Sequence, residues 1–283
     1  METVEKLDVN DQLPPEVARA RRPQWLVLML IGSFGGAGTA VWAGSVVDVL
    51  GRLGVGSQAA RSTLSRMTDR GALRRHRQGR EMYYSLSEGA AESVAYGRAL
   101  GLDPVDHSWN GTWTVVAASI PERHRALRHQ LSSRLSWEGF GQVQSGLWAT
   151  PREADVAALL RGLDAMKHVR VFTGSLTVPV SVTELLREMY DLDQIAGRYE
   201  KFICRWAMDP VSQYGDPLSA YLVLTSEWAQ LVRSDPRLPK EHLPGDWCAV
   251  DAHRLFLRRL HEIEPNAQSQ ADSSLRYLAV KPG

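Results

Sequence analysis

The sequence is poor in cysteine, lacks a long apolar run and has almost no net charge. Its two cysteines, Cys204 and Cys248, belong to no CxxC motif or Cys/His cluster, which argues against structural zinc and a disulfide framework and favours buried free thiols. The longest apolar run, Trp25–Ile31, is far shorter than the roughly 20 residues of a membrane span, and no signal peptide opens the chain. We therefore expect a cytoplasmic protein that does not bind membranes.

Positive charge is concentrated in one short segment. The 283 residues include 33 Lys+Arg and 32 Asp+Glu, so the formal net charge is only +1. Between Ser57 and Leu86, however, seven arginines stand against two acids, Asp69 and Glu81, which gives +5 locally. Charge runs usually form a solvated surface, but an island of this kind in a neutral protein is typical of a binding site for a polyanion.

Residues 23–100 are predicted to form a winged helix-turn-helix. Apolar residues recur at helical spacing in three segments, and two strand-like runs follow with Gly79 in the turn between them. Ser57 is a suitable N-cap for the third helix, and Gly71 ends it. The predicted elements are helices over 23–34, from 42 or 43 to 53, and over 58–70, then strands over 73–77 and 81–86. A helix-turn-helix of this kind places its last helix in the major groove of DNA.

The exposed face of the third predicted helix and the hairpin carry the residues that we expect to bind DNA. The guanidinium group of arginine can form two hydrogen bonds to guanine or to a phosphate, and Gln and Ser can form hydrogen bonds to base edges. Arginines at the hairpin tip are placed to reach a phosphate or the minor groove. The candidate residues are Ser57, Gln58, Arg61, Ser62, Ser65, Arg66, Arg74, Arg75, Arg77 and Arg80. The alternative is a module that docks only onto another protein.

Residues 109–180 are predicted to form a ferredoxin-like domain, because their apolar pattern gives the order βαββαβ. The predicted elements are strands over 113–119, 140–143, 145–150 and 169–173 and helices over 121–137 and 152–166. This fold resembles that of small CRISPR-adaptation nuclease-like proteins, which hold a metal with an acidic residue at the end of the first strand. Ser119 and Ile120 occupy that place, so we expect a scaffold with dimer contacts and no metal site.

Residues 183–265 are predicted to form a helical domain. Apolar residues recur at helical spacing over 191–208, 217–233 and 249–263. The polar ends of the chain, 1–22 and 266–283, are expected to be a flexible segment and a tail. The chain is therefore predicted to be of the α+β class.

Three segments of the chain resemble the PaaX-like family of transcriptional regulators, the type that represses phenylacetic acid catabolism. The first, SQAARSTLSRMTDRGALRRHRQGREMYYSLSEGA, supplies the family's Leu-x-Arg-Met and Tyr-x-Leu runs and its basic wing, with Gly89 one place late. The second, over 109–151, includes IPE, a run like RLxWxGFG, and GLW. The third, SDPRLPKEHLPGDW, resembles DP-x-LP-x-x-LLP-x-x-W. The chain departs from the family at Ala249, where glycine is common, and at SEWAQ, where basic residues are expected.

The resemblance covers residues 24–263 and implies a repressor that dimerises on double-stranded operator DNA. It also implies release by an aryl-coenzyme A thioester, phenylacetyl-CoA in the type case. A pocket for that effector needs apolar walls and cations for its phosphates. The candidates are Arg198, Tyr199, Lys201, Arg205 and Trp206, although an aromatic stripe at helical spacing equally fits a helix core.

Two other functions stay open at this stage. One is an activator, or a regulator of another pathway with a different effector. The other is a CoA-thioester-processing enzyme, which lacks support because the sequence has no GxSxG, no paired Cys/His arrangement and no HExxH. We therefore expect no catalytic residue and no cofactor.

Overall fold

The computed structural model describes residues 22–36, 38–103, 109–177, 181–208 and 213–281. The chain divides into two compact units, each assembled from segments that are distant in sequence. Unit 1 comprises Met1–Asp103, Cys204–Gln230 and Arg254–Gly283. Unit 2 comprises Pro104–Ile203 and Leu231–His253. The flexible segment predicted over 1–22 lies outside the described residues, apart from Arg22.

Unit 1 begins with three helices and a β-hairpin, in the order predicted for a winged helix-turn-helix. The helices bury apolar side chains at the predicted spacing; Leu30, Leu50 and Leu64 are at most 1% exposed. Gly56, rather than the predicted Ser57, precedes the third helix, because Ser57 is already its first residue. The elements are α2 (Pro23–Phe34), β1 (Thr39–Trp42), α3 (Ala43–Arg52), α4 (Ser57–Asp69), β2 (Leu73–Gln78), β3 (Glu81–Leu86) and α5 (Glu88–Leu102).

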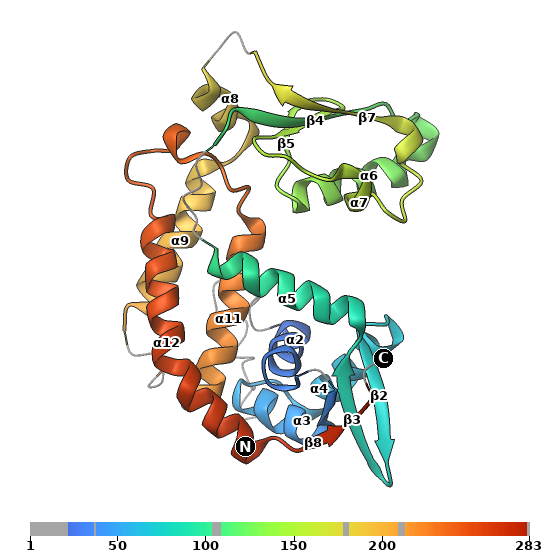
Figure 1. Cartoon of the computed structure of the whole chain (residues 1–283), viewed down its shortest axis with the longest axis vertical. Helices are drawn as coiled ribbons and strands as arrows, with labels where there is room; N and C mark the ends of the chain where they lie inside the picture. Colours follow the sequence, from blue (N-terminus) through green and yellow to red (C-terminus); the bar gives the residue numbers. More distant parts are fainter. Residues whose placement is uncertain (1–21, 37, 104–108, 178–180, 209–212, 282–283) are drawn as a thin grey trace, which may run out of the picture. The chain divides into compact units, whose positions relative to one another are not determined.

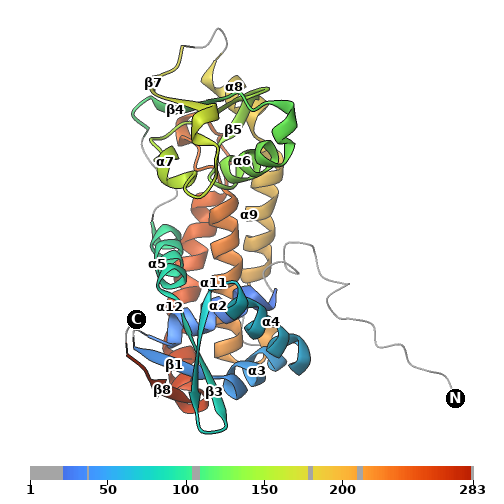
Figure 2. The same cartoon turned by 90° about the vertical axis from the view of Figure 1, so that its right-hand side faces the viewer.

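The sheet of unit 1 includes two strands that the sequence did not predict. β1 pairs with β3, and on its other side with β8 (Tyr277–Ala279), so the strand order is β2-β3-β1-β8. Figure 1 shows the last strand following the last helix, and Figure 2 shows the same strand beside β1. The prediction of a tail over 266–283 is therefore wrong for the residues that the structure describes. Ala267 and Ala271, both fully buried, continue the apolar face of α12 (Ala249–Ser274) to its end.

Helices from the C-terminal half of the chain complete unit 1. The indole of Trp228 in α11 (Pro217–Ser234) stacks on Phe256 of α12 at 4.6 Å and donates to the Gly101 carbonyl of α5 at 2.8 Å. The Tyr221 hydroxyl of α11 donates to the Ser33 hydroxyl of α2 at 3.2 Å. The helices predicted as one domain over 183–265 therefore contribute to both units.

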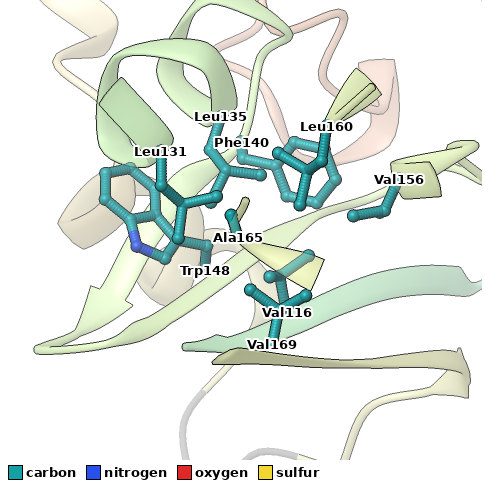
Figure 3. Close-up of a cluster of buried hydrophobic side chains, with 9 residues drawn as sticks. All are labelled: Val116, Leu131, Leu135, Phe140, Trp148, Val156, Leu160, Ala165 and Val169. Atoms are coloured by element: carbon teal, nitrogen blue, oxygen red, sulfur yellow. The ribbon is translucent and has the colours of Figure 1, made fainter. Parts of the chain in front are cut away.

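Unit 2 contains a four-stranded antiparallel sheet of order β5-β6-β4-β7, which is the ferredoxin-like arrangement that the sequence predicts. The α+β class is thereby confirmed. Figure 3 shows the buried cluster between the sheet and its helices, which includes Trp148, Leu131 and Phe140. The elements are β4 (Thr112–Ala118), α6 (Arg125–Trp137), β5 (Gly141–Gln144), β6 (Leu147–Thr150), α7 (Val156–Leu159) and β7 (Val169–Ser175).

The second helix of unit 2 is shorter than predicted. Only Val156–Leu159 of the expected segment 152–166 is α-helical. Gly162 takes a left-handed φ of 81°, which ends the helical path, yet Leu160 and Ala165 remain fully buried. The apolar residues at those positions are buried without being α-helical, which explains why the sequence pattern resembled that of a helix.

A tyrosine joins the helices that follow the sheet to the sheet itself. α8 (Val182–Met189) begins with a capping box between Ser181 and Glu184, and Tyr190 directly follows it. The Tyr190 hydroxyl donates to the Gly139 carbonyl at 2.9 Å and accepts from the Gly141 amide at 3.0 Å. Burial raises the pKa of Tyr190 well above its usual value, so the hydroxyl stays a donor.

The two cysteines differ from the sequence expectation. Cys204 is exposed and Cys248 is half-buried, so the prediction of buried thiols is wrong for Cys204. Cys204 lies on the solvent side of α9 (Leu192–Trp206), whereas Phe202, two residues before it, is fully buried. Within the described residues, none of the helices is long and apolar enough to cross a membrane.

Replacing Tyr190 with phenylalanine should lower the free energy of unfolding by about 1–3 kcal/mol, because two backbone groups lose their hydrogen-bond partner. Urea denaturation followed by circular dichroism measures this change. Tyr96→Phe is the matched control, since Tyr96 is 62% exposed and should change stability by no more than about 0.5 kcal/mol. Equal losses in the two variants would contradict the anchoring role.

Candidate nucleic-acid interface

Helix α4 presents one apolar face to unit 1 and one polar face to solvent. Its buried residues are Ala60, Thr63, Leu64 and Met67, which recur at helical spacing. Gly71, with φ of 74°, lets the chain turn sharply into β2. All the residues of α4 predicted to bind DNA are exposed, namely Ser57, Gln58, Arg61, Ser62, Ser65 and Arg66.

The β2–β3 hairpin closes with a two-residue loop, Gly79-Arg80. Gly79 has φ of 61°, as predicted, and glycine with positive φ at the first loop position is typical of a type II′ turn. Tyr83 and Tyr84 in β3 are buried. The four arginines predicted to bind DNA from this hairpin, Arg74, Arg75, Arg77 and Arg80, are all exposed.

The helix and the hairpin share one basic face beside Tyr84. The register pairs Arg75 with Tyr84, so their side chains lie on the same face of the hairpin. Burial raises the pKa of the Tyr84 phenol, while the positive charges of Arg75 and of Arg61 on α4 lower it. Both guanidinium groups therefore lie close enough to one phenol to act on it electrostatically.

The exposed arginines of α4 and the hairpin are not neutralised by acids. In the part of the chain that the structure describes, no ion pair includes any of them. Arg66 Nη2 donates to Thr63 Oγ1 at 3.4 Å and Arg77 Nε donates to the Gly79 carbonyl at 3.0 Å, both of which are neutral acceptors. Arginines elsewhere in unit 1, such as Arg98 and Arg205, do pair with carboxylates. This face thus keeps its positive charge for an external anion.

One exposed arginine of the island was not among the sequence candidates. Arg70 directly follows α4, at the residue that caps its C-terminal end, and is exposed. The local charge excess in the sequence already included Arg70. The sequence placed Arg70 at the end of the predicted helix over 58–70 and not among the residues of its exposed face, which explains its omission.

The five residues predicted to bind an effector lie in different environments. Arg198, Tyr199 and Lys201 belong to unit 2, whereas Arg205 and Trp206 belong to unit 1. Lys201 is exposed and Arg198 is half-buried, hydrogen-bonded to Gln194 on the same helix.

The two aromatic residues of this set are buried and use their polar atoms within the fold. The Tyr199 hydroxyl donates to the Asp235 carboxylate, and Trp206 Nε1 donates to Glu227 Oε2 at 3.0 Å. Arg205 forms an ion pair with the same Glu227. The structure therefore brings Arg205 and Trp206 together on one acid, and the effector site stays a prediction.

Comparison with known proteins relates all parts of the chain to one family. A model described as PaaX-like protein matches residues 22–90, one described as the PaaX protein central Cas2-like domain matches 106–186, and one described as the PaaX-like protein C-terminal domain matches 190–273. The transcriptional repressor PaaX of Escherichia coli (strain K12) is 27% identical over 243 residues, which cover 81% of this chain and 76% of that protein.

A solved structure resembles this fold. The uncharacterized protein Rv0674 from Mycobacterium tuberculosis matches with a TM-score of 0.55 and 21% sequence identity. The match covers 86% of this chain and 96% of that one. At this level of identity the likeness is one of fold.

Replacing Arg75 with alanine should raise the pKa of the Tyr84 phenol further, because the variant lacks one of the two positive charges that lower it. NMR of the protein with ¹³C-labelled tyrosine, titrated with base, measures this pKa. Arg74→Ala is the control, since Arg74 pairs with Ser85 and points to the opposite face of β2. A shift with Arg74→Ala and none with Arg75→Ala would place the hairpin register one residue away.

Proposed function

The chain belongs to the PaaX-like family, and we propose that it is a cytoplasmic, DNA-binding transcriptional repressor of an aromatic-compound catabolic pathway. The observation that carries this proposal is the exposed face of α4 and the β2–β3 hairpin, whose arginines have no acid partner among the described residues. A related protein named as a repressor supports the direction of regulation.

In this proposal α4 is the recognition helix and the hairpin is the wing. Arg61 and Arg66 are spaced five residues apart on the exposed side of α4, where a guanidinium group can form two hydrogen bonds to guanine. Ser62 and Ser65 offer hydroxyl groups to base edges between them. Arg77 and Arg80 at the wing tip bind phosphates, which adds affinity without sequence preference.

We further propose that the protein acts as a homodimer. A two-fold dimer presents two copies of α4, so the operator should be a near-palindrome whose half-sites follow the spacing of the two helices. Dimerisation doubles the number of phosphate contacts and makes the affinity steeply dependent on salt.

The proposed signal is an aryl-CoA thioester such as phenylacetyl-CoA. It releases the operator only if it binds the DNA-free arrangement of the protein more tightly than the DNA-bound one. Arg198 and Lys201, which have solvent access on α9, are the cations that we propose for its phosphates. The hydrogen bonds that Tyr199 and Trp206 donate to Asp235 and Glu227 support a role for these two rings in the packing of the helix.

Alanine at Arg61 or Arg66 should remove most of the preference for operator over unrelated duplex, because each base contact contributes about 1–3 kcal/mol of discrimination. Alanine at Arg77 should instead weaken binding to all duplexes alike and lower the salt slope by about 1. Fluorescence anisotropy at several salt concentrations measures both quantities.

Arg258→Ala serves as the control for these variants, since Arg258 is an exposed arginine of α12. It should bind DNA as the unsubstituted protein does. Full operator preference in both Arg61→Ala and Arg66→Ala would overturn the assignment of α4 as the recognition helix.

Footprinting on the DNA that flanks the gene, at fixed salt, tests the repressor and its effector together. We expect protection of a two-fold site that phenylacetyl-CoA relieves. Protection that survives the thioester would keep the regulator and reject this effector in favour of another one. Absence of protection, together with turnover of an acyl-CoA by the pure protein, would replace the proposal with an enzyme.

A further inference from the structure

The end of the chain contacts the β2–β3 hairpin through a forked ion pair. Arg276 directly precedes β8, and its two terminal nitrogens donate to the two carboxylate oxygens of Glu81 at 2.8 and 2.7 Å. The Tyr83 hydroxyl donates to Glu81 at 2.8 Å and lies 3.4 Å from Arg276 Nη2. Two parallel N–H···O bonds of this kind fix direction as well as distance. Glu81 is the first residue of β3, directly after the hairpin loop.

The guanidinium group of Arg276 is itself held in place from the other side. It lies 4.5 Å from the centre of the Trp42 ring, at the end of β1. The Trp42 ring in turn covers Gly44, and a Cβ atom at that position would lie only 2.3 Å from the ring. Backbone bonds complete the support, since Trp42 N donates to the Arg276 carbonyl at 2.9 Å and Arg276 N donates to Ser45 Oγ at 3.1 Å.

Arg276 is the cation with which Glu81 pairs in the described residues. Glu81 pairs across the hairpin with Gln78, beside the loop that carries Arg80 and one step from Arg77. Arg77 pairs with Met82 and so points to the opposite face of the hairpin from Glu81, which leaves Arg80, the residue directly before Glu81, as the neighbouring cation. An ion pair between Glu81 and Arg80 would reduce the charge available to phosphate. In the described structure Glu81 pairs with Arg276, and Arg77 and Arg80 have no acid partner.

From this geometry we infer that Arg276 is a positioning residue for DNA binding: it holds Glu81 so that the hairpin keeps its orientation and its arginines stay available to phosphate. The inference rests on the proposed function, because it concerns the hairpin that we propose as the wing. By this inference the segment that leads into β8 contributes to DNA binding, although Arg276 lies outside the arginine-rich segment 57–86 in sequence.

Glu81→Ala distinguishes positioning from plain electrostatics. Removal of a negative charge from a DNA-facing hairpin should by itself tighten binding to any duplex. If Glu81 and Arg276 position the hairpin, the variant should instead bind about fivefold or more weakly. Its salt slope should fall by about 1–2, as expected when two arginines lose their phosphates. Anisotropy titrations of the full-length protein on operator and unrelated duplexes measure affinity and slope.

A mutant cycle tests whether both residues act through the same hairpin arginines. Arg276→Ala should reproduce the loss, and the double variant Glu81→Ala/Arg276→Ala should lose no more than either single variant. In an Arg77→Ala/Arg80→Ala background, Arg276→Ala should have no further effect on affinity. The preference for operator over unrelated duplex should stay unchanged throughout, because α4 is not altered.

The matched control is Arg98→Ala. Arg98 forms an exposed ion pair with Glu264 in the same unit at 2.9 Å, and the arginine side chains of the two pairs are equally exposed, at 52%. This variant should bind DNA normally. Thermal melting of each protein identifies general loss of folding; if Glu81→Ala melts early, Glu81→Gln, which keeps an acceptor for Arg276, replaces it and should lose less affinity than Arg276→Ala.

Two failures are distinguishable. If the unsubstituted protein shows no salt-dependent binding to duplex DNA, the proposed function fails and the inference fails with it. If the unsubstituted protein binds but Glu81→Ala binds more tightly, or Arg276→Ala binds as Arg98→Ala does, the positioning role alone is overturned.

Discussion

The hydrogen bonds between β8 and β1 join the last described strand to the first, and the architecture of unit 1 depends on them. β1 is only four residues long, and its two central residues, Ala40 and Val41, are completely buried. A strand this short needs a partner on each side, because unpaired backbone groups in a buried strand are costly. β3 supplies one side, and β8 supplies the other with Val280 N donating to the Gly38 carbonyl at 2.8 Å just beyond it.

The buried acid Glu227 imposes a second constraint on unit 1. It is 6% exposed and receives hydrogen bonds from Arg205 and from Trp206, two consecutive residues at the end of α9. Arg259 of α12 donates to the Trp206 and Ala207 carbonyls at 2.9 and 2.8 Å, which satisfies backbone groups that a helix end leaves open. A buried ion pair often adds little net stability, and we infer that these contacts instead specify where α9 ends against α11 and α12.

Elements with a strong period could be predicted from the sequence, and elements that depend on distant partners could not. α4 was found because Ala60, Leu64 and Met67 recur along one face, and the hairpin because Gly79 separates two alternating runs. β1 and β8 were missed because, unlike the similarly short β5 and β6, neither forms a hairpin with a strand that neighbours it in the sequence. The pairing between them joins residues more than 230 positions apart.

The same difference applies to the candidate site. The exposed arginines of α4 and the hairpin follow from amphipathic spacing and local charge, which the sequence displays directly. The contact between Arg276 and Glu81 spans 195 positions and leaves no local pattern. The roles of Tyr199 and Trp206 were ambiguous in the sequence, because aromatic residues that line a ligand pocket and those that form a helix core recur at the same spacing.

The charge count over 57–86 rests on sequence alone and therefore understates the positive charge of the region that α4 and the hairpin form. Arg276 lies outside this segment but joins it in space, so eight arginines and two acids, Asp69 and Glu81, give +6 in place of +5. The added arginine neutralises Glu81 without engaging any guanidinium group of α4 or the hairpin tip. An acid within a basic surface lowers the affinity of that surface for a polyanion. The loss is small when the acid is paired with a cation that does not itself contact the polyanion. Glu81 can then orient the hairpin while the arginines beside it remain available to phosphate.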